Sequence, residues 1–169
     1  MHPLVELAKR AVEEYARQHR RLASPARFPD EFRRPAGAFV SIKKMGELRG
    51  CIGTIAPRHA ELPDEVIENA ISACSGDPRF MPVEPDELAD LSYSVDVLGQ
   101  PEPVGGREDL DPKIYGVIVK KGLRHGILLP DLEGVDTVEK QLSITKRKAG
   151  LRPDEEGCEL ERFRVTRYR

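Results

Sequence analysis

The chain has 169 residues, with 27 Lys and Arg against 29 Asp and Glu, and its formal net charge is −2. This balance excludes a strong overall attraction to nucleic acid or to an anionic membrane surface. Hydrophobic residues at 39% and charged residues at 33% are typical of a soluble globular protein, and the length suits a single domain.

The N-terminal half of the chain predicts a helix, a hairpin and a second helix. Apolar residues recur at helical spacing in the first segment, and Gly46 separates two short strands. Proline is suited to a helix start and glycine to a helix stop, and both flank the next apolar stripe. The predicted elements are a helix at 3–22, strands at 38–44 and 48–55, and a helix from Pro63 to Gly76.

The C-terminal half predicts shorter elements. They are a helical turn within 82–90, a strand at 92–98, a loop at 101–106, hairpin strands at 115–119 and 123–129, a helix at 137–149 and a strand at 160–168. Hairpins with helices between them favour the α+β class over a doubly wound sheet. We therefore expect antiparallel sheets with flanking helices.

No apolar run approaches the ~18 residues that a membrane-spanning helix needs. The three cysteines are widely spaced and form no Cys-x-x-Cys pair, which argues against a disulfide framework and against a structural zinc site. We therefore expect a cytoplasmic protein with no membrane partner and no metal site.

The segment Leu48-Arg49-Gly50-Cys51-Ile52-Gly53 has the composition of a site rather than of a plain strand. Glycine weakens a strand and usually marks a bulge or a close approach to the backbone. In an extended segment, Leu48, Gly50 and Ile52 would share one face, and Arg49, Cys51 and Gly53 the other. A cation beside a thiol favours the reactive thiolate.

Six stretches of the chain together resemble the AMMECR domain family, whose microbial members are called protein A of the AmmeMemoRadiSam system. The resemblance covers nearly the whole chain, in the right order. Its most specific motif is Leu-Arg-Gly-Cys-Ile-Gly, and Asp-Pro-Arg-Phe supports it independently. The stretches are 37–42, 48–54, 68–73, 77–80 with Pro82-Val83, 126–130 and 148–151.

The resemblance implies one AMMECR-type domain over 1–169, with an α+β fold in two unequal lobes and an intracellular location. It implies no reaction, since the family has no established biochemical activity. The name of the system implies association with a Memo-like protein and a radical S-adenosylmethionine protein. These two proteins are the partners that we expect, together with an unknown small ligand and an unknown cofactor, if any.

The expected site combines the two specific motifs. Cys51 is the candidate nucleophile, redox thiol or soft metal ligand, although a free cysteine is most often a small buried hydrophobe. Arg49 and Arg79 each suit a carboxylate or phosphate, or else a structural ion pair. The candidate ligand-binding residues, expected in a cleft between the lobes, are Arg49, Gly50, Gly53, Asp77, Arg79 and Phe80.

Three functions remain open at this point. The first is a small-ligand-binding or accessory protein, and the second is a thiol-dependent enzyme that uses Cys51, with His59 as a base that could fold back toward it. The third is a nucleic-acid-binding adaptor that uses arginine clusters in 17–21, 146–152 and 162–169. The balanced charge favours a solvated surface for these clusters and argues against nucleic acid.

Overall fold

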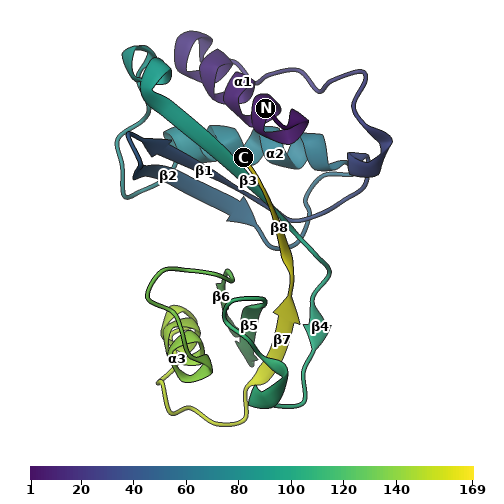
Figure 1. The fold of residues 1–169 in the computed structure, drawn as a ribbon, viewed down its shortest axis with the longest axis vertical. Helices are drawn as coiled ribbons and strands as arrows, with labels where there is room; N and C mark the ends of the chain where they lie inside the picture. The colour runs from purple at the N-terminus through teal and green to yellow at the C-terminus, as the bar shows by residue number, and fades with distance from the viewer. The chain divides into compact units, whose positions relative to one another are not determined.

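The computed structural model describes all 169 residues, which form two compact units. The first unit comprises Met1–Leu98 and Thr166–Arg169, and the second comprises Gly99–Val165. Each unit has one four-stranded sheet with helix packed on it (Figure 1). The predicted α+β fold with two unequal lobes is confirmed.

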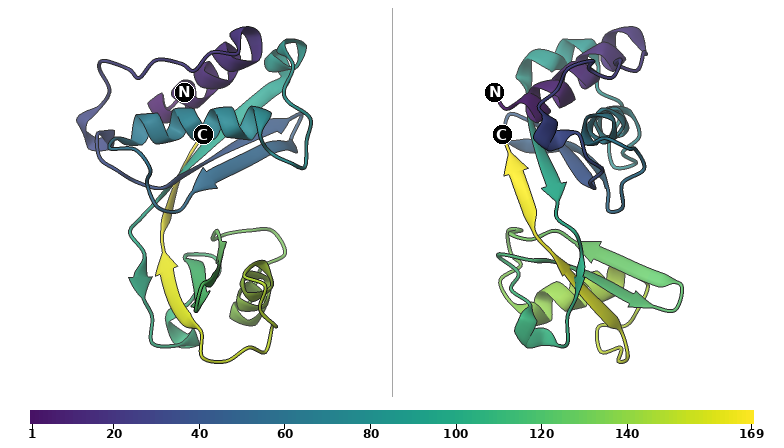
Figure 2. Two further views of the ribbon diagram at one scale, coloured as in Figure 1. Left: turned by 180° about the vertical axis from the view of Figure 1, so that it is seen from behind. Right: turned by 90° about the vertical axis from the view of Figure 1, so that its right-hand side faces the viewer.

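The sheet of the first unit has the strand order β2-β1-β3-β8. Two helices pack against it, and the view from behind in Figure 2 shows α2 in front of the strands. The unit is built from α1 (Pro3–Gln18), β1 (Ala38–Lys44), β2 (Glu47–Thr54), α2 (Leu62–Ser75), β3 (Leu91–Leu98) and β8 (Val165–Tyr168), with 3₁₀ turns at Asp30–Phe32 and Pro85–Asp90.

Alternation along β1 divides this sheet into two sides. Ala38, Val40 and Ile42 are fully buried in the core with the helices. The residues between them point the other way. We call that other side the helix-free face, and it carries Phe39, Ser41 and Lys43 with their register partners Leu48, Cys51, Gly53, Ser92, Ser94 and Asp96.

Helix α1 begins and ends at histidines. The Nδ1 atom of His2 accepts a hydrogen bond from the backbone N–H of Leu4 at 3.2 Å, and Pro3 occupies the first turn. The helix ends at Gln18, four residues before the predicted end at Leu22, because the left-handed φ of 52° at His19 stops it. None of the helices combines the length and apolar character needed to cross a membrane.

The sheet of the second unit has the strand order β4-β7-β5-β6, with one helix packed on β5 and β6. The unit is built from β4 (Glu102–Pro103), β5 (Gly116–Lys121), β6 (Arg124–Leu128), α3 (Val138–Lys148) and β7 (Glu159–Phe163), with a 3₁₀ turn at Arg107–Asp109. Its core is smaller than that of the first unit.

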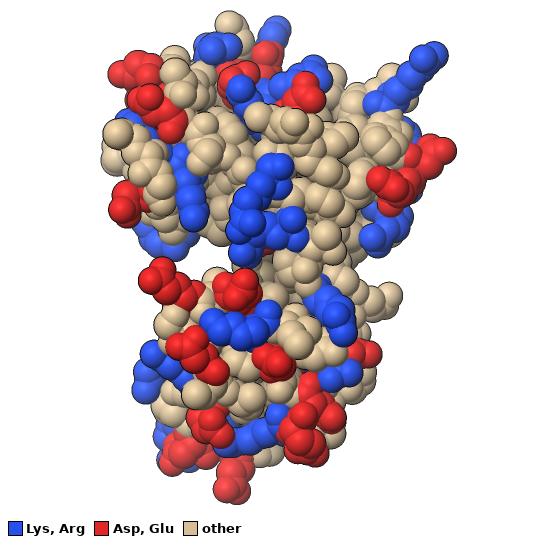
Figure 3. All heavy atoms as spheres, viewed as in Figure 1, with Lys and Arg blue, Asp and Glu red and all other residues tan.

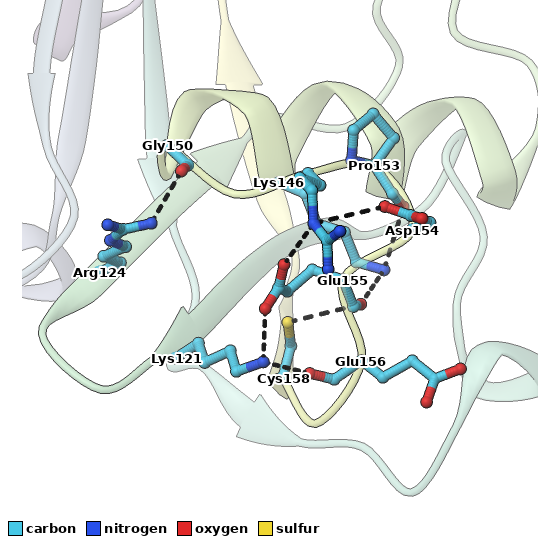
Figure 4. Close-up of polar contacts among 10 residues, drawn as sticks. Lys121, Arg124, Lys146, Gly150, Pro153, Asp154, Glu155, Glu156 and Cys158 are labelled. Atoms are coloured by element: carbon cyan, nitrogen blue, oxygen red, sulfur yellow. Dashed lines mark hydrogen bonds and ion pairs between the residues drawn. The ribbon is translucent and has the colours of Figure 1, made fainter.

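Cations hold the loop that follows α3 (Figure 4). The buried Lys146 donates from Nζ to the carbonyl oxygens of Pro153 and Glu155, at 3.4 and 2.9 Å. Lys121 donates to the carbonyl of Glu156 at 2.6 Å, and Arg124 donates to a carbonyl at the start of the loop. The loop therefore has a defined path although it contains no regular structure.

Two sequence predictions for the C-terminal half need correction. The single strand expected at 160–168 is two strands, since the chain leaves the second sheet after Phe163 and joins the first sheet at Val165. Alternation continues through Arg164, so no local signal marks the change. The loop expected at 101–106 contains the short strand β4, which pairs with β7.

Candidate functional site

A β-bulge interrupts the hairpin that carries the Leu48–Gly53 segment. Leu48 pairs with Lys43, but Gly50 pairs with Ile42, so Arg49 is one extra residue on β2. The two turn residues before it both have positive φ, which closes the hairpin tightly. The register beyond the bulge is therefore shifted by one residue.

The bulge determines where the thiol of Cys51 points. Cys51 pairs with Ser41 on the helix-free face, and the Ser41 Oγ lies 3.2 Å from the Cys51 Sγ. If Arg49 paired with Ile42 in a regular register, Cys51 would stand opposite Val40, which is fully buried beneath the helices. A shift of one residue moves a side chain to the other side of a sheet, so the bulge brings the thiol out of the core.

The expectation that Arg49 and Cys51 point the same way is wrong, because the bulge breaks the alternation between them. The Nε and Nη2 atoms of Arg49 donate to the two carboxylate oxygens of Glu87, at 3.0 and 2.9 Å. Its Nη1 and Nη2 also donate to the carbonyls of Met81 and Pro82. All three guanidinium nitrogens are used, and the pair ties the hairpin to the segment that follows Asp77.

Glu87 serves as the centre of this structural contact. It also accepts from Lys44 Nζ at 3.1 Å and from the backbone N–H of Glu84 at 3.0 Å. The hydrogen bonds from Arg49 are the main reason that the pKa of Glu87 is lowered to about 2. Sequence reasoning missed Glu87, since nothing in its surroundings marks a partner 38 residues away.

The Asp77 and Arg79 side chains close the outer edge of β2 at Cys51. The Oδ2 atom of Asp77 accepts from the backbone N–H of Cys51 at 3.0 Å, and Arg79 Nη2 donates to the carbonyl of Cys51 at 3.3 Å. Asp77 and Arg79 are joined by two bonds between their side chains, at 3.0 and 2.8 Å, and by one from the backbone N–H of Arg79, at 3.1 Å. The ion pair therefore offers an acceptor and a donor to an edge strand, as a neighbouring strand would.

Burial and charge set the state of Asp77. Asp77 is buried, with 4% of the residue exposed. The hydrogen bonds from Arg79 hold the pKa of its carboxyl far below the ordinary value, although burial acts in the opposite direction. The pKa of Arg79 is raised, chiefly by the hydrogen bonds to Asp77 and to a smaller extent by the nearby Cys51. Both members of the pair, the Asp77 carboxylate and the Arg79 guanidinium, are therefore charged, and the pair lies beside the thiol.

Gly50 and Gly53 are explained by two different close approaches. A Cβ on Gly50 would lie 2.2 Å from the carbonyl oxygen of Ala73, so helix α2 rests directly on β2 there. A Cβ on Gly53 would lie 2.2 Å from the ring of Phe39, its cross-strand partner. Both glycines are required by contacts within the chain.

The two motifs therefore meet within the first unit. Cys51, Asp77 and Arg79 are in direct contact, and the ring of Phe80 lies 5.4 Å from the Arg79 guanidinium. Ser41 joins the group through its contact with the thiol, although the sequence alone did not single it out. The expected position of this group between the two lobes stays a prediction.

The histidines have other surroundings. His59 donates its backbone N–H to the carboxylate of Glu65 in the first turn of α2, at 2.9 Å. His2 and His19 lie at the ends of α1. The side chain of Cys51 contacts a serine hydroxyl but no histidine.

Several members of the arginine clusters form ion pairs inside their own unit. In the first unit, Arg21 pairs with Asp64 and Glu68. In the second unit, Arg162 pairs with Glu102 at 2.7 Å and lies over the ring of Tyr115. These contacts agree with the structural interpretation of the clusters. No group of three or more His, Cys, Asp or Glu side chains is arranged to hold a metal ion.

With this geometry in view, comparison with known proteins identifies the family. The model of the family described as AMMECR1 matches residues 5–168. The chain belongs to the AMMECR1 family. The Asp77–Arg79 contact with Cys51 joins the two stretches of the sequence on which the resemblance to this family chiefly rested.

The names of the relatives state no function. A Thermotoga maritima protein is 52% identical over 170 residues, which cover 99% of this chain and 98% of the relative. Protein CA_C1420 of Clostridium acetobutylicum is 47% identical over 169 residues, and this chain spans only 36% of its length. The crystal structure of the uncharacterised protein PH0010 from Pyrococcus horikoshii matches with a TM-score of 0.90 and 34% identity, over 97% of this chain and 88% of that one.

Proposed function

We propose that this chain is an accessory protein that binds a small ligand on the helix-free face of its first unit, at Cys51, Arg79 and Phe80. It works with a Memo-like protein and a radical S-adenosylmethionine protein. The single observation that carries the ligand site is the bulge at Arg49. Bulges are common beside functional sites because they re-aim a side chain.

The bulge has a cost that the fold alone does not explain. It interrupts the ladder of an edge strand and moves a cysteine, a residue that is usually buried, out of the core. The Asp77–Arg79 pair then fixes the backbone of the same residue through two hydrogen bonds. A half-buried thiol whose own backbone is fixed in this way supports a binding role.

The relative from Clostridium supports a role with a partner. Only 36% of its length corresponds to this chain, so the same domain forms part of a much longer protein there. Domains joined in one chain often act together. The identity of the two partners rests on the name of the system to which the family's microbial members belong.

Two measurements on the purified chain test this proposal. Ultrafiltration with a cell extract of small molecules, read by mass spectrometry, is expected to retain at least one compound on the wild-type protein and not on Arg79→Gln. Size-exclusion chromatography with the Memo-like and radical S-adenosylmethionine proteins of the same genome is expected to show co-elution.

Lys113→Gln is the control for both measurements, since Lys113 belongs to the second unit and pairs there with Asp136 at 2.9 Å. It should retain the compound as the wild type does. The proposal is rejected if the wild type retains nothing above the level of denatured protein and elutes alone.

A thiol-dependent enzyme is the second candidate, and the contact between Ser41 Oγ and Cys51 Sγ favours it, because a polar neighbour can orient the sulfur. It requires Cys51 to react rapidly near neutral pH. Iodoacetamide labelling followed by peptide mapping measures that rate, and a rate no higher than that of glutathione would reject this candidate.

A further inference from the structure

The two arginines of the site motifs differ in how much of each guanidinium is used. Arg49 engages all three nitrogens with Glu87 and two carbonyls. Arg79 uses only Nε and Nη2, for Asp77 and the Cys51 carbonyl, and its Nη1 has no hydrogen-bond partner within the chain. Arg79 therefore presents unused donors beside the thiol.

Burial shows which way this ion pair faces. The side chain of Asp77 is 2% exposed, whereas that of Arg79 is 55% exposed. The acid lies underneath, and the guanidinium faces solvent in an orientation that two bonds to the carboxylate fix. A fixed guanidinium with a free edge is suited to planar oxyanions.

A second cation, Lys43, lies on the helix-free face, to which the thiol of Cys51 points. Lys43 follows Ser41 by two residues on β1, and its register partner is Leu48 on the helix-free face. Lys43 is exposed and has no ion pair with any acid. Strand geometry places its Cβ about 7 Å along β1 from that of Ser41, so the flexible chain reaches the surroundings of the thiol.

The surface charge of the first unit agrees with this arrangement. In the view of Figure 3, which has the strands of the first unit in front of α2, Lys and Arg side chains lie across the middle of the unit. Acidic side chains lie toward its margins, together with further Lys and Arg side chains. The middle of the face thus presents positive charge to a ligand.

We propose that this face holds an oxyanion, with the Arg79 Nη1 and Lys43 Nζ atoms as its donors, so that the ligand of the proposed site carries a phosphate or carboxylate group. This inference rests on the proposed ligand site and adds the chemical class of the ligand. The hydroxyl of Ser41 and the thiol of Cys51 lie beside each other, with Lys43 two residues along β1 from Ser41 and Arg79 bonded to the Cys51 carbonyl, and they would contact the body of the ligand.

Cys51 itself provides the probe. Iodoacetate and iodoacetamide react alike with a thiolate, which displaces iodide and forms a carbon–sulfur bond, but only iodoacetate carries a negative charge. The quantity to measure is the rate with iodoacetate divided by the rate with iodoacetamide at Cys51, by peptide mapping at low salt. The same ratio for glutathione is the reference.

The expected ratio at Cys51 exceeds that of glutathione by about five- to tenfold. Lys43→Gln should lower it about threefold, which is the effect of one unit charge about 7 Å away in water. Arg79→Gln should lower it further, and because that change leaves the buried Asp77 unpaired, Lys43→Gln is the decisive variant if Arg79→Gln unfolds. A ratio equal to that of glutathione overturns the proposal.

The neighbouring Lys44 provides a matched control. It pairs with Glu87 on the Arg49 side of the hairpin, so Lys44→Gln removes the same charge one residue away and should leave the ratio unchanged. If the rate ratio fell equally in Lys43→Gln and Lys44→Gln, the effect would come from the overall charge of the protein, and the proposal would be overturned.

Protection of Cys51 against labelling distinguishes a phosphate ligand from a carboxylate ligand. Inorganic phosphate and malonate, each compared with chloride at equal ionic strength, should slow the labelling of Cys51, and the stronger protector indicates the group. If neither reagent labels Cys51, the amide NMR signals of Ser41 and Cys51 are followed during titration with phosphate, and unmoved signals reject the proposal. A neutral compound retained in the ultrafiltration experiment would sustain the ligand site while rejecting the oxyanion.

Discussion

In both units a helix rests on a glycine of the hairpin that precedes it. The Cβ positions of Gly50 and Gly126 would lie 2.2 and 2.4 Å from helix carbonyl oxygens, of Ala73 in α2 and Thr145 in α3. The same close packing of helix on strand thus occurs twice, although the sequence contains no detectable repeat.

Two further contacts recur. A phenylalanine ring covers its cross-strand glycine in each unit, Phe39 over Gly53 and Phe163 over Gly116. A helix amide also holds the start of each hairpin, since Asn69 donates to Ala38 at 2.9 Å and Gln141 donates to Tyr115 at 2.8 Å. These amide bonds link α2 to β1 and α3 to the residue before β5.

The bulge, a thiol on the hairpin and the Asp77–Arg79 pair occur only in the first unit. The second unit packs its helix on its hairpin without them. Contacts that both units share are therefore sufficient to build this packing, and the contacts that only the first unit has are the ones that require another explanation. This difference supports a binding role at Cys51.

The largest loss of stability is expected from variants that break the packing shared by the two units. Gly50→Ala and Gly126→Ala each drive a methyl group into a helix carbonyl, and each should lower the free energy of unfolding by about 3 kcal/mol, at the upper end of typical overpacking costs. Urea unfolding measures this loss.

Gly105→Ala is the control for both variants, because a Cβ there would meet nothing closer than 3.8 Å. Its unfolding midpoint should stay within error of that of the wild type. Equal stability of all three variants would contradict the close packing of the helices on the hairpins.

An intermediate effect is expected from Asp77→Asn. The change removes a buried charge that accepts from Arg79, and charged hydrogen bonds of this kind contribute roughly 1.5–3 kcal/mol, so a loss of about 2 kcal/mol is expected at pH 7. Urea unfolding of wild type and variant at pH 7, 5 and 3 measures the loss and its pH dependence.

The pH dependence follows from the lowered pKa of Asp77 in the folded state. The stabilisation is fully present above the ordinary value of 3.8 and is lost as the pH falls toward the lowered pKa. The stability gap between wild type and Asp77→Asn should therefore narrow below about pH 4. Asp90→Asn, at an exposed position, is the control, and a gap that stays constant to pH 3 would argue against the charged state of Asp77.

The smallest effect on stability is expected from Cys51→Ala. The thiol is only half-buried and its side-chain hydrogen bond is to Ser41, so the loss should stay below about 1 kcal/mol by urea unfolding. Retention of the ultrafiltered compound should nevertheless fall. A loss as large as that of Gly50→Ala would instead make Cys51 a structural residue.

Much of the fold could be predicted from local patterns. Helical spacing located α2 and α3, and Gly46 located the first hairpin. The site was harder, because its geometry depends on one extra residue at Arg49. The glycine beside it indicated a bulge or a close approach, but strict alternation was assumed across the segment, and so Arg49 was placed with Cys51 instead of with Glu87.

The contact between the two motifs could be expected but not located. The resemblance to the family indicated that the Asp77 turn accompanies Cys51, whereas the sequence does not show that a carboxylate would bind the backbone N–H of an edge strand. Such a contact depends on where α2 ends relative to β2, and that distance is set by the packing of Ala73 on Gly50.

The passage of the chain from β7 to β8 affects the order in which the protein can be completed. Thr166–Arg169 belong to the first unit, yet they follow all 67 residues of Gly99–Val165 along the chain. A ribosome therefore synthesises the whole second unit before the first sheet receives its fourth strand. During synthesis, β3 remains an open edge for the time needed to add these residues, roughly 3–13 s at typical elongation rates.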